Sequence, residues 1–156
     1  MNKYITYIFP PVFYLCIALA GSAFTSQGLG PWYDTLAKPS FTPQGSVIGM
    51  IWTVIYILAA ISLIIFISNA RDKHGFWPII GLYIINGIIN AGWSYIFFTM
   101  HLIGLAVIDA GLIGATVLVM IVAVWRYSTA ASIFLVPYLG WVSFATYLTY
   151  IIHKMN

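Results

Sequence analysis

The stretch from Ser46 to Ser68, SVIGMIWTVIYILAAISLIIFIS, contains no charged residue. A helix needs about 20 largely apolar residues to cross the roughly 30 Å hydrocarbon core of a membrane. This stretch is long enough, and four further apolar runs are found at approximately residues 5–24, 78–99, 104–125 and 131–152. The runs lack the alternation of apolar and polar residues that is typical of the strands of a membrane barrel. The sequence therefore predicts an all-α integral membrane bundle of five transmembrane helices, with residues 1–156 forming a single domain and a long structured first loop.

The composition excludes several classes of protein. Hydrophobic residues make up 62% of the chain and charged residues only 6%, against about a quarter in soluble domains. The expected partner is the lipid bilayer. Because the few charges are scattered singly, nucleic acid is excluded as a partner. No Ser-His-Asp set, Gly-rich phosphate loop or pair of nearby carboxylates can be assembled.

The histidines do not have the spacing of a metal site. His74, His101 and His153 fall on links or helix ends, not at the i, i+4 spacing of a helical zinc site. The only cysteine, Cys16, lies inside the first apolar run. We therefore predict no metal site, and no cofactor is required.

The distribution of basic residues predicts the orientation. If the five runs span the membrane, one face receives Lys3, Arg71, Lys73 and Arg126, and the other receives Lys38 and Lys154. The positive-inside rule then places the N-terminus inside. The first run resembles a signal peptide, but Pro10 and Pro11 interrupt it and its length exceeds the usual apolar region. We expect a retained membrane span.

The link at residues 25–45 is the only long one, and it contains WYDTLAKPSFTP at residues 32–43. Pro39 and Pro43 disfavour helix at the residues before them, so we expect this loop not to extend the first or second span. Its aromatic side chains, Trp32, Tyr33 and Phe41, would be costly to expose to water. The loop is predicted to form a lid over the end of the bundle.

Aromatic and amide side chains share helical faces. Asn86, Asn90, Trp93 and Phe97 recur at i, i+4, i+7 and i+11 in the third span, Trp52 and Tyr56 form an i, i+4 pair in the second, and Trp141, Ala145 and Leu148 share a face of the fifth. Two interpretations remain open. The rings form an aromatic belt at the membrane surface, or they form the wall of a pocket for a flat, mostly apolar ligand.

Asp109 is the only carboxylate within a predicted span. An acid at membrane depth is by default a candidate functional group, such as a proton relay. Because Asp109 falls near the end of its helix, a structural role at interfacial water or at a neighbouring helix end is the alternative. Small residues in the same span, Ala106, Ala110 and Gly114, predict close helix packing.

Taken together, the motifs resemble the translocator protein family, also called the tryptophan-rich sensory protein or peripheral benzodiazepine receptor family. WYDTLAKPSFTP is followed by GMIWTVIY, then NAGWSYIFF, then Asp109, then PYLGWVSFATYLTY. The resemblance covers nearly the whole chain, and the chain looks like a bacterial member of this family. It implies a five-helix bundle, commonly a homodimer, in the bacterial plasma membrane. It also implies binding of protoporphyrin IX, haem, sterols and synthetic benzodiazepine or isoquinoline ligands.

The resemblance further implies which residues bind the ligand. These are Ser22, Tyr33, Pro43, Ile48, Trp52, Asn90, Trp93, Trp141 and Ala145. Three functions follow as hypotheses: a binding and sensing protein, an enzyme that degrades protoporphyrin IX in light and oxygen, or a transporter of porphyrin or lipid. In the enzyme hypothesis, Trp52 and Trp141 are the catalytic residues, acting as redox-active rings beside the excited porphyrin. Asp109 is the only acid available to a proton-coupled transporter.

Overall fold

The computed structural model describes residues 3–156 and contains five long helices. Four of them are α1 (Lys3–Gly28), α3 (Gly45–Ala70), α5 (Ile103–Trp125) and α7 (Val136–Met155). The remaining long helix is α4 (Phe76–Ser94), which continues into a π-helical turn, η1 (Tyr95–Thr99). Two short helices, α2 (Pro31–Thr35) and α6 (Thr129–Ile133), lie between long ones. All five long segments have the length and apolar composition of membrane spans. The predicted helical membrane bundle is confirmed.

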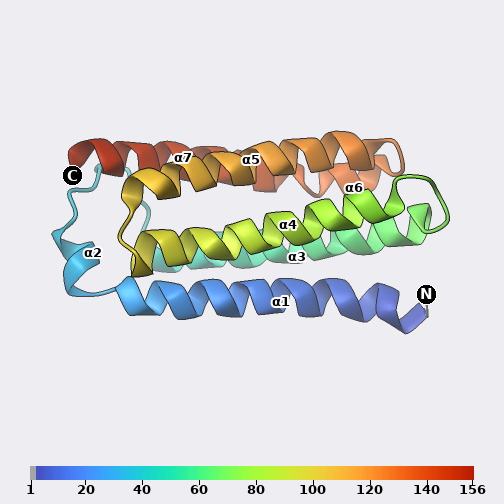
Figure 1. Ribbon diagram of the computed structural model, residues 1–156, viewed down its shortest axis with the longest axis horizontal. Coiled ribbons are helices and arrows are strands. Elements are labelled where there is room, and N and C mark those ends of the chain that lie inside the picture. The colour runs from blue at the N-terminus through green and yellow to red at the C-terminus, as the bar shows by residue number, and fades with distance from the viewer. Residues whose placement is uncertain (1–2) are drawn as a thin grey trace.

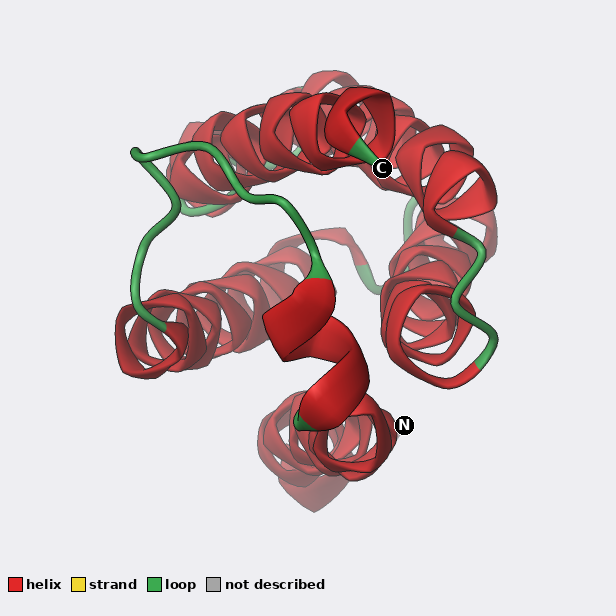
Figure 2. Ribbon diagram, turned by 90° about the vertical axis from the view of Figure 1, so that its left-hand side faces the viewer, coloured by secondary structure: helices red, strands yellow, loops and turns green. Residues whose placement is uncertain are grey.

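The long helices lie alongside one another, with the chain termini at opposite ends (Figure 1). We call the end that carries α2 and the end of α7 the lid end, and the other the far end. Helix α1 packs against α3 and α4, and α5 packs between α4 and α7. Viewed from the lid end, α2 extends from the end of α1 toward the middle of the bundle, and a loop then runs on to α3 (Figure 2).

The far half of the bundle is tightly packed. Its core includes Leu63 and Phe66 of α3, Tyr83 of α4 and Met120 of α5, all fully buried. Ser62 fastens this region, because its hydroxyl hydrogen-bonds the Tyr83 hydroxyl at 2.7 Å and donates to the Ala131 carbonyl of α6 at 2.7 Å.

The first span is longer than the sequence predicts. Helix α1 continues through Pro10 and Pro11 and ends at Gly28, four residues beyond the predicted end. The expectation that residues from 25 onward form a loop is therefore wrong. Gly28 allows this extension, because a Cβ atom here would overlap the Phe98 carbonyl oxygen and lie 2.6 Å from the Phe98 Cβ. The lid is consequently shorter than predicted, and we define it as residues 29–44.

The end of the third span departs from regular α-helix. The π-helical turn at Tyr95–Thr99 accommodates one extra residue in the turn. As a result two consecutive aromatic residues, Phe97 and Phe98, both point inward and are buried. Periodicity predicts an inward position for Phe97, whereas the inward position of Phe98 depends on the wider turn. Both rings lie directly beneath the lid.

Candidate functional site

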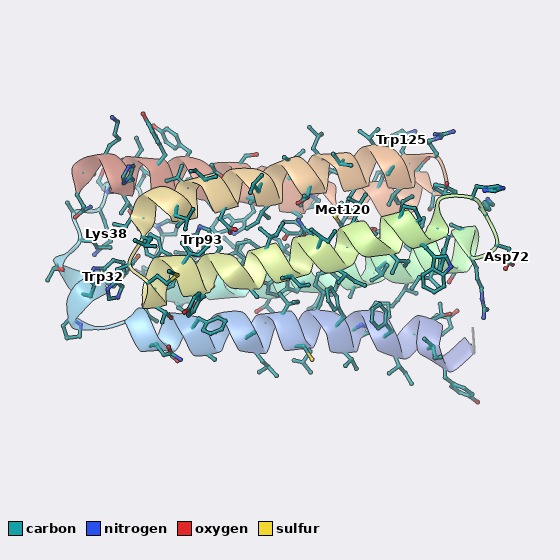
Figure 3. All side chains as sticks on the ribbon, viewed as in Figure 1. Trp32, Lys38, Asp72, Trp93, Met120 and Trp125 are labelled. Atoms are coloured by element: carbon teal, nitrogen blue, oxygen red, sulfur yellow. The ribbon has the colours of Figure 1, made fainter. Side chains whose placement is uncertain are left out.

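The lid is ordered around α2 and is anchored by its aromatic residues. Pro31 occupies the first turn of α2, where a missing backbone N–H costs nothing. The Trp32 ring packs edge-on against Phe97 with centroids 5.6 Å apart, and the Tyr33 ring lies 5.7 Å from Phe98. Figure 3 shows Trp32 and Lys38 at this end, with Trp93 the next labelled residue inward along the bundle. The predicted lid is thus closed over the π-helical turn.

Lys38 holds the lid in its turned conformation. Its ammonium group donates to the Tyr33 carbonyl at 2.5 Å and to the Leu36 carbonyl at 3.1 Å. The same group lies 4.4 Å from the centroid of the Tyr33 ring, which is a cation–π contact. Partial burial raises the pKa of the Tyr33 phenol, and the neighbouring Asp34 charge raises it further. Tyr33 therefore stays neutral across the physiological pH range.

Beneath the lid, indole rings from three helices pack against one buried cluster. Trp52 of α3, Trp93 of α4 and Trp141 of α7 all contact the cluster formed by Ile55, Ile113, Val117, Tyr138 and Val142. Trp52 meets Trp141 edge-on at 6.4 Å, and Trp93 stacks on Phe97 at 5.0 Å with nearly parallel planes. We call Trp52, Trp93 and Trp141 the indole cluster. The structure therefore brings together the three tryptophans that the sequence indicates.

Two of these indoles have no hydrogen-bond partner. The Nε1 atoms of Trp93 and Trp141 are buried, and neither finds an acceptor in the described part of the chain. By contrast, Trp77 and Trp125 are 70% and 54% exposed and lie toward the far end. Trp77 and Trp125 have the exposure of aromatic-belt residues, whereas the indole cluster does not. Buried, unpaired N–H groups are costly and rare in folded proteins, so these two donors, like the unpaired Tyr14 hydroxyl, retain a hydrogen-bonding capacity that the described residues do not use.

A chain of hydrogen bonds crosses the bundle below the indoles. The Tyr56 hydroxyl donates to Asn90 Oδ1 at 2.6 Å, and Asn90 Nδ2 donates to the Tyr138 hydroxyl at 2.8 Å. The Tyr138 hydroxyl donates to Asn86 Oδ1 at 2.9 Å, and Asn86 Nδ2 donates to Thr116 Oγ1 at 2.8 Å. This chain joins α3, α4, α7 and α5, so it fixes how the walls of the indole cluster sit relative to one another.

The other predicted ligand residues differ in position. Asn90 is buried and its amide is engaged by Tyr56 and Tyr138, so in this state it positions the wall. Pro43 and Ile48 are half-buried at the start of α3, and Ala145 is half-buried one turn beyond Trp141. Ser22 is exposed on α1. The structure thus does not bring Ser22 to the indole cluster, and its role in binding stays a prediction.

Asp109 lies in the second turn of α5 and is half-buried. Its Oδ2 atom is buried without a hydrogen-bond partner in the described part of the chain. Among residues 3–156, Asp109 Oδ2 accepts no hydrogen bond from a neighbouring helix end, so the capping form of the structural role is not seen. The alternative form, contact with interfacial water, stays a prediction. The facing stripe of α4 is set by the bonds from Asn86 to Ile113 and Thr116. Asn86 of α4 bonds Thr116 of the antiparallel α5. Trp93, seven residues after Asn86, and Asp109, seven residues before Thr116, therefore lie at about the same level of the bundle.

The open grooves of the structure lie elsewhere. One, of about 400 Å³, lies at the lid end and is lined by His101, Leu102, Ile103, Gly104, Leu105, His153 and Asn156. Another, of about 320 Å³, lies at the far end beside Ile121, Val122, Trp125 and Arg126. Neither includes a residue of the indole cluster. The rings of Trp93 and Trp141 are half-buried and their Nε1 atoms are buried, so the two donors do not face either of these grooves.

Residues 3–156 contain no group of three or more His, Cys, Asp or Glu side chains placed to hold a metal ion. His101 instead stacks on Trp32, with ring centroids 3.9 Å apart and planes 15° apart. Its backbone has a positive φ of 58°, uncommon for a residue other than glycine. This histidine therefore supports the lid from the link between η1 and α5.

Some residues of the site were missed from the sequence. Tyr138, at the centre of the hydrogen-bond chain, lies three residues before Trp141, so the i, i+3 spacing carried a usable signal. Phe98 carried no such signal, because its inward position depends on η1. Asn156 also contacts the lid, and a single asparagine beyond a helix gives no sequence indication of its partner.

Sequence comparison with known proteins shows the family of the chain. The model of the TspO/MBR family matches residues 10–155. The chain is 40% identical over 126 residues to "Tryptophan-rich protein TspO" of Bacillus cereus, with 80% of each chain covered. It is 35% identical to the protein of the same name from Chlorobaculum tepidum, with 91% of each chain covered. It is 32% identical to "Translocator protein" of Homo sapiens, covering 87% of this chain and 81% of the relative.

Proposed function

The chain belongs to the TspO/MBR family, and on that premise we propose that it binds tetrapyrroles, protoporphyrin IX or haem, at the indole cluster beneath the lid. The protein is an integral membrane protein with five apolar spans. Flat, largely apolar ligands suit a wall of indole and phenol rings, because they stack on the ring faces while a few polar groups fix their orientation.

The observation that carries this proposal is the pair of unpaired indole donors, Trp93 Nε1 and Trp141 Nε1. A buried donor without a partner costs about 1–3 kcal/mol. A ligand that offers carboxylate or carbonyl oxygens removes this cost at both positions. Protoporphyrin IX has two propionate groups, and synthetic benzodiazepine or isoquinoline ligands offer a carbonyl oxygen. Oxygen acceptors are therefore common to the tetrapyrroles and to the synthetic ligands that the family resemblance implies.

The binding experiment is a fluorescence titration of protoporphyrin IX into the purified protein in lipid nanodiscs. Replacing Trp93 or Trp141 by Phe keeps an aromatic ring and removes one N–H donor. We expect each replacement to weaken binding about 10- to 150-fold, which corresponds to the roughly 1.5–3 kcal/mol of one hydrogen bond to a charged acceptor. Trp77→Phe is the matched control, since Trp77 is exposed on the outside of α4. Equal affinities for all three variants and the unchanged protein would contradict the proposal.

A second candidate function is light-dependent degradation of the bound porphyrin. The observation that favours it is the contact between Trp52 and Trp141, two oxidisable rings with centroids 6.4 Å apart in the proposed site. In this candidate, O2 is the terminal oxidant and the porphyrin is the group degraded. The excited porphyrin takes one electron from an indole and passes it to O2, and the indole radical that is left must be re-reduced by an external one-electron donor before the next turnover. Illumination of the complex should then bleach the porphyrin Soret band faster than illumination of free porphyrin. The acceleration should disappear in Trp52→Phe and Trp141→Phe.

Transport of a porphyrin or lipid is less well supported. Among the described residues, the only carboxylate within a span is Asp109, which lies two turns from the lid end and not at the middle of the membrane. The bacterial plasma membrane, with the N-terminus inside, is the proposed location because the far end carries most of the basic residues. Assembly as a homodimer is proposed from the family resemblance.

A further inference from the structure

The lid is hydrogen-bonded to α7 through one side chain. The Ala37 backbone N–H donates to Asn156 Oδ1 at 3.0 Å, and Asn156 Nδ2 donates to the Ala37 carbonyl at 3.0 Å. The asparagine amide therefore pairs with both backbone groups of one lid residue, as a neighbouring strand would. The two residues are 119 positions apart in the sequence, so this pair joins the lid to the end of the last span.

Both partners are held in place for this pairing. Asn156 Nδ2 also donates to the Ile152 carbonyl at 2.8 Å, which fixes the amide against the last turn of α7. Ala37 follows Leu36, whose ψ of 133° ends α2 in an extended conformation. Ala37 lies outside any helix, so its N–H and C=O groups have no helical partners, and the asparagine side chain supplies both.

The other hydrogen bonds of the lid side chains stay within the lid. Lys38 donates to Tyr33 and Leu36, Thr35 donates to the Trp32 carbonyl at 2.7 Å, and the Thr42 hydroxyl donates to the Pro39 carbonyl at 2.7 Å. These bonds make the lid a unit with its own shape. Between the lid and the bundle there are also ring contacts, such as Trp32 on His101 at 3.9 Å and Phe41 on Tyr147 at 6.0 Å.

We propose that Asn156 is a positioning residue that latches the lid and thereby controls how fast a ligand enters and leaves the indole cluster. The latch itself is a feature of the ligand-free protein, while its effect on ligand exchange rests on the proposed function. Trp93 Nε1 and Trp141 Nε1 are buried when the lid is closed, so exchange of a ligand requires an opening. The ring contacts are less directional than the paired hydrogen bonds, so the amide of Asn156 defines the register of the lid more narrowly than they do.

The latch predicts a kinetic effect distinct from an effect on affinity. Because Asn156 touches the lid and not the indole cluster, its loss raises the open fraction with and without ligand. Association and dissociation rates should therefore both rise, by about tenfold for two partly exposed hydrogen bonds. The dissociation constant should change by less than about threefold, since the ligand contacts are intact.

Two measurements on the full chain in nanodiscs test this. The first is hydrogen exchange of the peptide containing Ala37 in the ligand-free protein, and the second is stopped-flow quenching of protoporphyrin IX fluorescence. Asn156→Ala is compared with Asn69→Ala. Asn69 makes the same kind of amide bond near the end of α3, from Nδ2 to the Ile65 carbonyl at 2.8 Å, but at the far end and without a lid partner. Loss of a helix-end amide bond is therefore common to both variants.

The expected result is about tenfold faster exchange at Ala37 and about tenfold faster ligand association and dissociation in Asn156→Ala alone. Unchanged exchange at Ala37 overturns the latch. Faster exchange at Ala37 with unchanged ligand rates overturns its control of the site. If the unchanged protein does not bind protoporphyrin IX, the proposed function fails, while the exchange measurement on ligand-free protein still decides whether Asn156 holds the lid.

Discussion

Replacing Tyr138 by Phe should destabilise the bundle, because it removes one hydroxyl group that makes two hydrogen bonds. The Tyr138 hydroxyl accepts from Asn90 Nδ2 at 2.8 Å and donates to Asn86 Oδ1 at 2.9 Å. Phenylalanine retains the ring, including its edge-on contact with Trp52 at 5.9 Å. The substitution therefore breaks the hydrogen-bond chain between α4 and α7 without removing aromatic packing.

The size of the effect follows from what the lost hydroxyl leaves behind. Asn86 is fully buried and Asn90 nearly so, so neither amide gains water as a replacement partner. Hydrogen bonds between membrane helices average about 0.6 kcal/mol each, which gives about 1.2 kcal/mol for two. If both amide groups remain unpaired, the loss approaches the desolvation cost, about 3 kcal/mol. We expect a loss of about 1–3 kcal/mol in the free energy of unfolding.

The assay is equilibrium unfolding in mixed micelles, followed by tryptophan fluorescence and helical circular dichroism. The matched control is Tyr150→Phe, which removes a hydroxyl from an exposed position on the same helix. Adding Asn90→Leu to Tyr138→Phe forms a double-mutant cycle that isolates the bond between the two side chains. If Tyr138→Phe and Tyr150→Phe differ by less than about 0.5 kcal/mol, the hydrogen-bond chain does not hold the walls together.

Two other perturbations test the end of the bundle beneath the lid. Gly28→Ala should destabilise the fold by about 1–3 kcal/mol, because the added Cβ overpacks against the Phe98 backbone. Gly92→Ala is the control, since nothing lies within 4 Å of a Cβ added there, and it should be neutral or slightly stabilising in the same unfolding assay. Equal effects of the two substitutions would contradict the close approach of α1 to η1. The pKa of Tyr33 is raised in the closed lid, so the phenol ionises first in the open state. The contribution of Tyr33 to lid closure is therefore complete below the ordinary tyrosine pKa of about 10 and is lost as the pH rises above that value. Hydrogen exchange at Ala37, corrected for the intrinsic pH dependence of exchange, should show this alkaline opening in the unchanged protein and lose it in Tyr33→Phe; the same alkaline opening in both would exclude Tyr33 as its source.

Much of the fold is predictable because hydropathy alone determines the spans. Residues 46–68 contain no charge, and the helix found there, α3, extends only one residue earlier and two residues later. The end of α1 was not predictable in the same way. Pro39 and Pro43 indicate that a loop precedes α3, but the continuation of α1 to Gly28 depends on how closely Phe98 approaches, which is a tertiary contact.

The site was predictable to the level of helical faces. Spacing placed Asn86, Asn90 and Trp93 on one stripe, and all three point into the bundle. It did not show which polar group each amide meets, since Asn90 pairs with Tyr56 and Tyr138 on two other helices. Pairings across helices depend on register and crossing geometry, so they required the structure. The same reason explains why the bond between Asn156 and Ala37 was not foreseen.

The most direct test of the central claim observes the indole N–H groups themselves. Among the six tryptophans of the chain, Trp93 and Trp141 have buried, unpaired Nε1 atoms, and Trp77 and Trp125 are exposed. In protein labelled with ¹⁵N at the indole nitrogen, saturation with protoporphyrin IX should shift the Trp93 and Trp141 resonances downfield, as new hydrogen bonds form. The Trp77 and Trp125 resonances should remain in place. Saturable binding that leaves the Trp93 and Trp141 resonances unmoved would contradict a ligand held by these two donors.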